Sequence, residues 1–121
     1  RACAEFAVAP NAEAYMAGRR EGLMAFCTHE RGVAEGRAGH AYGSVCPQEV
    51  AADFREGYAR GHARFELERR LQAVREDIAR TEAALKEGIR EPRERSRAVE
   101  RLENLTREAG GLEQEIAQNP L

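Results

Sequence analysis

The side chains best suited to chemistry in this sequence are cysteines and histidines between residues 27 and 46. Cys27, His29, His40 and Cys46 offer two thiols and two imidazoles, which are the ligand types of a tetrahedral zinc site. Their C-x-H and H-x5-C spacings differ from those of paired zinc-binding knuckles, and the two cysteines could instead form a disulfide. The two hypotheses exclude each other, because a sulfur atom in a disulfide cannot also be a thiolate ligand.

Signals for catalysis are weak elsewhere in the chain. The sequence has no G-x-S-x-G, phosphate-loop or H-E-x-x-H motif, and each histidine is alone in its segment. Cys3 has no nearby base that would lower its pKa. We therefore expect no enzyme activity, no cofactor and no metal, and we expect His29, His40 and His62 to be surface or capping residues.

Glycines dominate the first half of the sequence, where eight of the 11 lie between Gly18 and Gly61. Glycine costs a helix about 1 kcal/mol relative to alanine, so glycine at helical spacing needs a reason, and close packing of backbones supplies one. The pattern Tyr15-xx-Gly18-xxx-Gly22 is repeated as Phe54-xx-Gly57-xxx-Gly61. We predict that these four glycines let two helices approach closely, each aromatic covering the glycines of the other helix.

A second interpretation of the same region is a small ligand groove. Tyr15, Arg19, Tyr42 and Tyr58 could line it, with glycines admitting a ligand close to the backbone. Tyrosines that fill a core explain the same residues more simply.

These residues need helices to position them. A first helix is expected over 12–26 with Asn11 as its cap, and a short second helix over 32–43 held by its packing. A third helix should begin near Pro47 and end before Gly88, and a fourth should begin near Pro92 and end before Asn119. Apolar residues in these two helices step by three and four positions, as in a coiled coil: Leu71, Val74, Ile78, Thr81 and Leu85, then Leu102, Leu105, Ala109, Leu112 and Ile116.

The chain therefore has two parts. All seven aromatic residues and all three cysteines precede residue 66, which separates a Gly-rich, Cys-containing helical head (1–61) from an antiparallel coiled-coil hairpin (62–121) with its turn near 88–92. The predicted fold class is all-α, with closely packed short helices continuing into this hairpin.

Charge limits the possible partners. The net charge is −2, and arginines alternate with glutamates, so the chain lacks the uncompensated positive charge that nucleic-acid binding requires. No run of 18 apolar residues is present, so we expect no membrane span. The first residues do not have the pattern of a signal peptide.

The spacing of glycines, aromatics and cysteines resembles a known bacterial lipoprotein family, the one catalogued as domain of unknown function 2799. The resemblance covers residues 1–85 and rests on three stretches: Tyr15-xx-Gly18-Arg19-xx-Gly22-Leu23-xx-Phe26-Cys27, Gly32-xxx-Gly36-xx-Gly39-xx-Tyr42-xx-Val45-Cys46-Pro47, and Phe54-xx-Gly57-Tyr58-xx-Gly61. It implies a signal peptide, a lipid-modified cysteine and a further Gly-rich, cysteine-bearing segment upstream of Arg1. The family supplies no activity.

The implied envelope location favours a Cys27–Cys46 disulfide over a zinc site, because disulfides persist in oxidising compartments. Cys3 would then pair with an absent upstream cysteine or form an intermolecular bridge. We expect a non-catalytic, lipid-anchored protein on the periplasmic side of the envelope that serves as an interaction or spacer module. Its partner would be another envelope protein, or a second copy, bound through the hairpin, and its membrane contact only the upstream anchor. The alternative is a small-ligand or metal-binding head.

Overall fold

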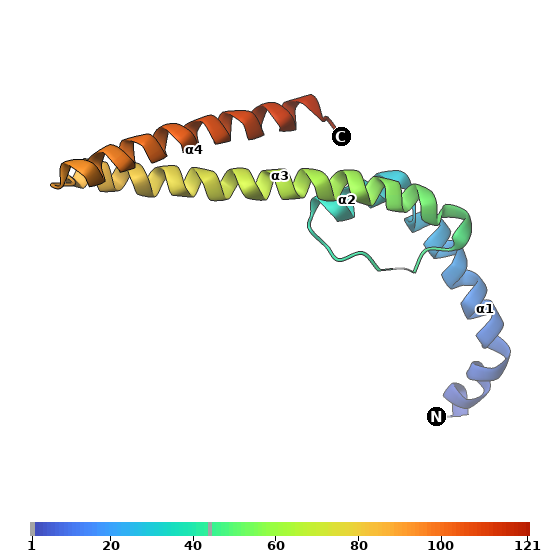
Figure 1. The fold of residues 1–121 in the computed structure, drawn as a ribbon. Helices are drawn as coiled ribbons and strands as arrows, with labels where there is room; N and C mark the ends of the chain where they lie inside the picture. The colour runs from blue at the N-terminus through green and yellow to red at the C-terminus, as the bar shows by residue number, and fades with distance from the viewer. Residues whose placement is uncertain (1, 44) are drawn as a thin grey trace. The chain divides into compact units, whose positions relative to one another are not determined.

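The computed structural model describes the backbone of residues 2–43 and 45–121, and the side chains of residues 11–43 and 45–121. It contains four helices, α1 (Ala2–Phe26), α2 (His29–Arg37), α3 (Gln48–Glu87) and α4 (Pro92–Gln118) (Figure 1). No strand occurs in the described backbone, so the predicted all-α class is confirmed. The chain forms two compact units, Arg1–His62 and Ala63–Leu121, and α3 contributes to both.

Helices α1 and α2 both begin earlier than the sequence analysis predicts. Helix α1 begins at Ala2 and continues past Asn11, so Asn11 is an interior residue and not the helix cap. Helix α2 begins at His29, where the Oγ1 atom of Thr28 accepts a 3.0 Å hydrogen bond from the backbone N–H of Arg31. It ends at Arg37 and not at Gly43, because Gly39 has a φ of 79°, a left-handed conformation that cannot continue the helix.

The turn between α3 and α4 lies where glycine and proline predict it. Gly88 has a φ of 100°, and its N–H lies 3.2 Å from the carbonyl oxygens of Ala84 and Leu85. Helix α4 begins at Pro92 after Glu91, whose carboxylate accepts a 2.7 Å hydrogen bond from the backbone N–H of Glu94. The predicted hairpin of a long helix and a second helix after residue 91 is confirmed (Figure 1).

The apolar seam forms the core of the second unit. The cluster consists of five buried residues: Leu71, Val74, Leu105, Ala109 and Leu112. The partly buried side chains of Leu67, Ile78 and Ile116 pack against it. Thr81 is also buried, and its hydroxyl donates a 2.8 Å hydrogen bond to the carbonyl oxygen of Asp77 in its own helix. The residues repeat at the a and d spacing that directs one stripe of each helix toward the other.

Arg64 fastens the end of α4. Its Nη2 donates hydrogen bonds to the carbonyl oxygens of Ile116 and Asn119, at 3.2 and 2.8 Å, and its side chain is only 12% exposed. The last carbonyls of a helix lack intrahelical partners and carry partial negative charge. A guanidinium from α3 therefore caps α4 at the open end of the hairpin.

Ion pairs join α3 and α4 along the outside of the seam. Arg75 pairs with Glu113 at 2.7 Å, and Arg101 pairs with Asp77 at 2.9 Å. The hydrogen bond from Arg80, followed by the field of Arg101, lowers the pKa of Asp77 below its usual value. A lowered folded-state pKa adds stability that is present above the unfolded pKa and is lost as the pH falls through the folded one. The contribution is small because the groups are solvated.

The seam predicts a large difference between two aliphatic truncations in α4. Leu112 is 4% exposed and Val99 is 42% exposed. Leu112→Ala should lower the free energy of unfolding by about 2–5 kcal/mol, because it removes buried methyl groups and leaves a cavity, whereas Val99→Ala should change it by less than about 0.5 kcal/mol. Urea unfolding followed by far-ultraviolet circular dichroism measures both. Equal effects would contradict the assignment of the core.

Candidate functional site

A disulfide joins the starts of two helices in the first unit. Cys27 lies between α1 and α2, Cys46 lies two residues before α3, and their sulfur atoms are bonded, with Cα atoms 5.8 Å apart. Cys27 is fully buried. Closing a loop of this length stabilises a fold by about 3 kcal/mol through the loss of unfolded-state entropy. The bond holds the N-terminal ends of α2 and α3 side by side.

Helices α2 and α3 run parallel and touch backbone to backbone. Gly57 lies against His29, and four residues later Gly61 lies against Val33, so the residue numbers of both helices rise in the same direction. The segment 38–47 returns the chain from the end of α2 to the start of α3. A Cβ atom on Gly57 or Gly61 would lie closer than 3.0 Å to a backbone carbonyl oxygen, so no other residue fits without moving the helices apart.

The contacts follow a two-fold pattern. Each glycine faces the carbonyl oxygen of the residue three positions before the glycine opposite it: Gly32 faces Phe54, Gly36 faces Tyr58, Gly57 faces His29, and Gly61 faces Val33. The carbonyl lies where the glycine would carry Cβ, which is the geometry of a Cα–H···O contact worth about 0.5–1 kcal/mol. The two helices therefore contribute equivalent surfaces to the pair.

Aromatic rings cover one side of this pair. Phe54 is 4% exposed, and its ring centroid lies 5.9 Å from that of Phe26 and 6.0 Å from that of Tyr42. Tyr42 also packs against Tyr58 at 5.4 Å, and the Tyr58 hydroxyl donates a 2.6 Å hydrogen bond to the carbonyl oxygen of His40. The rings bind the return segment to α3.

The structure corrects the predicted role of Gly18 and Gly22. Among the described residues, nothing lies within 4 Å of a Cβ atom built at either position, and Gly57 and Gly61 meet His29 and Val33 of α2, so α1 is not the helix that packs on them. Helix α2 takes that place because it supplies its own glycines at four-residue spacing, and the disulfide brings its start next to that of α3. Residues 11–22 of α1 are exposed throughout, and Tyr15 is 68% exposed.

The residues of the predicted ligand groove are not brought together. Tyr42 and Tyr58 pack ring against ring, whereas Tyr15 projects from the exposed part of α1. Arg19 borders a surface recess that none of the three tyrosines lines. The other residues that line this recess are Met16, Ala17, Arg20, Leu23, Val45 and Pro47. Beside it, Arg20 pairs with Glu49, and the pKa of Glu49 is lowered first by a hydrogen bond from its own backbone and next by Arg20.

Three of the four proposed zinc ligands have other partners. The sulfur atoms of Cys27 and Cys46 are bonded to each other, which removes both thiolates from the ligand set. His40 lies 2.9 Å from Glu35 through Nδ1, and His29 lies at the first position of α2. Among the residues whose side chains are described, no group of three His, Cys, Asp or Glu could hold a metal ion. The side chain of Cys3 lies outside the described residues.

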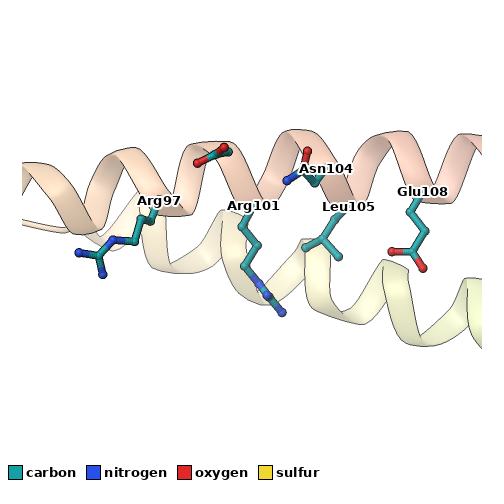
Figure 2. Close-up of a pocket in the computed structure, with 6 residues that line it drawn as sticks. Arg97, Arg101, Asn104, Leu105 and Glu108 are labelled. Carbon is teal, nitrogen blue, oxygen red and sulfur yellow. The ribbon is translucent and has the colours of Figure 1, made fainter.

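A recess on the second unit offers little for chemistry. Figure 2 shows it along α4, where Arg101 and Leu105 point toward α3. Arg101 already pairs with Asp77, and Leu105 belongs to the core. The other four lining residues are exposed: Arg97, Glu100, Asn104 and Glu108. The recess is part of the outer surface of the hairpin.

The fold and site thus define an all-α protein with a disulfide-linked pair of glycine-packed helices. A family model described as Protein of unknown function (DUF2799) matches residues 1–63, which is more than half of the chain. The chain belongs to this family, and the match ends where the first compact unit ends, within one residue. No curated protein and no solved structure matches the chain. Over the described residues, none of the helices combines the length and the apolar character needed to cross a bilayer.

The glycine contacts predict opposite effects of one substitution at two sites. Gly57→Ala should destabilise the first unit by at least about 1–3 kcal/mol, because the added Cβ meets the carbonyl of His29. Gly110→Ala in α4 should raise helix stability by about 0.5–1 kcal/mol, because nothing lies within 4 Å of that position. All three tyrosines lie in the first unit, so tyrosine absorbance during thermal unfolding reports Gly57→Ala, and circular dichroism reports Gly110→Ala. A neutral Gly57→Ala variant would refute the close contact.

Proposed function

We propose that this chain is a non-catalytic protein-binding module of the bacterial cell envelope, carried by a lipid-anchored protein that faces the periplasm. The observation that carries the proposal is the exposed side of α1 formed by Asn11, Tyr15, Gly18 and Gly22. Each of these residues is exposed, and Tyr15 is 68% exposed. Tyrosine is among the residue types that are enriched where protein–protein interfaces gain most of their binding energy.

The free energy needed to form helix α1 supports a binding role. Most of the stability of a helix in a protein comes from tertiary packing, and each glycine adds about 1 kcal/mol to the cost of forming the helix. Among the described residues, nothing lies close enough to Gly18 or Gly22 to supply a packing contact in return. A partner helix lying on this side would supply the missing contact, as α2 does for α3.

The seam of the hairpin is a less suitable binding surface than the sequence analysis assumed. A partner bound through the seam would need apolar residues left uncovered there, but Leu71, Val74, Leu105 and Leu112 are buried between α3 and α4. The proposal therefore places the binding surface on α1.

The envelope location is supported by the disulfide, since such bonds are rare in the reducing cytoplasm. Rapid alkylation of thiols in growing cells that express the natural gene tests it. We expect only Cys3, or no cysteine at all, to react with a maleimide reagent in the absence of reductant, and Cys27 and Cys46 to react only after reduction. Modification of Cys27 and Cys46 in cells without reductant would contradict an oxidising location.

Site-specific photocrosslinking in the same cells tests the binding surface. A photoreactive residue at Tyr15 should yield protein adducts, because the position lies on the exposed glycine side of α1. The same residue at Glu13, which lies on another side of the helix and is also exposed, is the matched control. Equal adducts at both positions, or none at Tyr15, would overturn the proposed binding function whatever the identity of the partner.

A further inference from the structure

The exposed side of α1 repeats the side of α3 that packs on α2. Tyr15, Gly18, Gly22 and Phe26 have the same spacing as Phe54, Gly57, Gly61 and Phe65. On α3 the two glycines are covered by the backbone of α2, while on α1 no described neighbour lies within 4 Å of a Cβ atom built at either corresponding glycine. The chain thus contains one occupied and one unoccupied copy of the same helical surface.

The occupied copy shows what kind of partner fits. In the α2–α3 pair each glycine meets the carbonyl three residues before the opposite glycine, and the relation is the same in both directions. A surface that contributes equivalently to both sides of a parallel pair is self-complementary, as a two-fold interface requires. Helix α1 carries two glycines at the same four-residue spacing, so a second α1 has the shape that its own surface needs.

We propose that α1 binds α1 of a second copy of this chain, in parallel and in register, with Gly18 and Gly22 at the crossing. This inference rests on the proposed protein-binding function and names its partner. In the pair, Gly18 of one copy faces the carbonyl oxygen of Tyr15 of the other, and Gly22 faces that of Arg19. Tyr15 then covers the glycines of the opposite helix.

Charge selects the parallel orientation. Arg19 and Glu21 lie on opposite flanks of the glycine side, since successive helical residues are about 100° apart. In a parallel two-fold pair the opposite flanks of the two helices meet, as in parallel coiled coils, so Arg19 of each copy lies beside Glu21 of the other. An antiparallel pair would bring like flanks together, with arginine near arginine and glutamate near glutamate.

The first measurement separates dimerisation from folding. Gly18→Ala with Gly22→Ala should raise the helical content and melting temperature of the monomer, because no atom of the described residues opposes the new Cβ atoms. The same change should abolish the dimer, because these atoms would strike the backbone of the second copy. Sedimentation velocity of the whole chain gives the association state, and Gly110→Ala with Gly111→Ala is the matched control, which should leave the dimer intact.

The second measurement fixes the register. In a Cys3→Ser background, Asn11→Cys places a thiol two turns before Gly18 on the glycine side, and Glu13→Cys places one on another side. We expect oxidation to yield a covalent dimer from Asn11→Cys and not from Glu13→Cys. A monomeric chain, a dimer that survives both glycine substitutions, or crosslinking at Glu13 alone would overturn the proposal. Photoadducts at Tyr15 with a different protein, from a chain that is monomeric when purified, would preserve the binding function and refute self-pairing.

Discussion

The first unit depends on one interaction, the direct contact between the backbones of α2 and α3. Four glycines make it possible, and each meets a carbonyl oxygen where any other residue would carry Cβ. Helix α2 has only nine residues and contains both of its contact glycines, so its own propensity cannot sustain it in water. Its helical state is therefore a consequence of the contact with α3, and the position of the return segment and the aromatic cluster follows from that contact.

A parallel pair of consecutive helices imposes a second requirement, since the chain must travel back before the next helix starts. Gly39 adopts a left-handed φ of 79° at the end of α2 and begins this return. The hydrogen bond from Tyr58 to the carbonyl of His40 and the rings of Tyr42 and Phe54 then hold the segment against α3. The disulfide links the N-terminal ends of α2 and α3, because it joins the cysteines that precede the two helices. Each of these interactions offsets part of the conformational entropy lost when the described part of the connection, which contains no helix or strand, is held in place.

Sequence patterns predict the second unit better than the first, and the reason is physical. The hairpin is encoded locally: Leu71 and Val74 face Leu105 and Leu112 because of a repeat within each helix, and Gly88 with Pro92 marks the turn. The glycine contact is not local. Spacing alone identifies Gly57 and Gly61 as a close-packing surface, but it cannot say whether α1 or α2 covers that surface. An aromatic residue precedes the glycines in both α1 (Tyr15) and α3 (Phe54), which favours α1 as the partner of α3. In the structure the partner is α2, which has His29 at the matching position. The partner is chosen by chain connection and by the disulfide, neither of which a motif contains.

The sequence is also insufficient to predict the chemistry of the cysteines. Residue types alone permit a zinc site or a disulfide at Cys27 and Cys46, since both need thiols that come together in the fold. What separates the two is the geometry at the helix starts. Parallel packing of α2 and α3 brings the residues before them to a Cα separation of 5.8 Å, within the usual range for a disulfide, while His40 is held at the far end of α2 by Glu35. The glycine contact and the disulfide therefore support each other, because both require the N-terminal ends of α2 and α3 to meet.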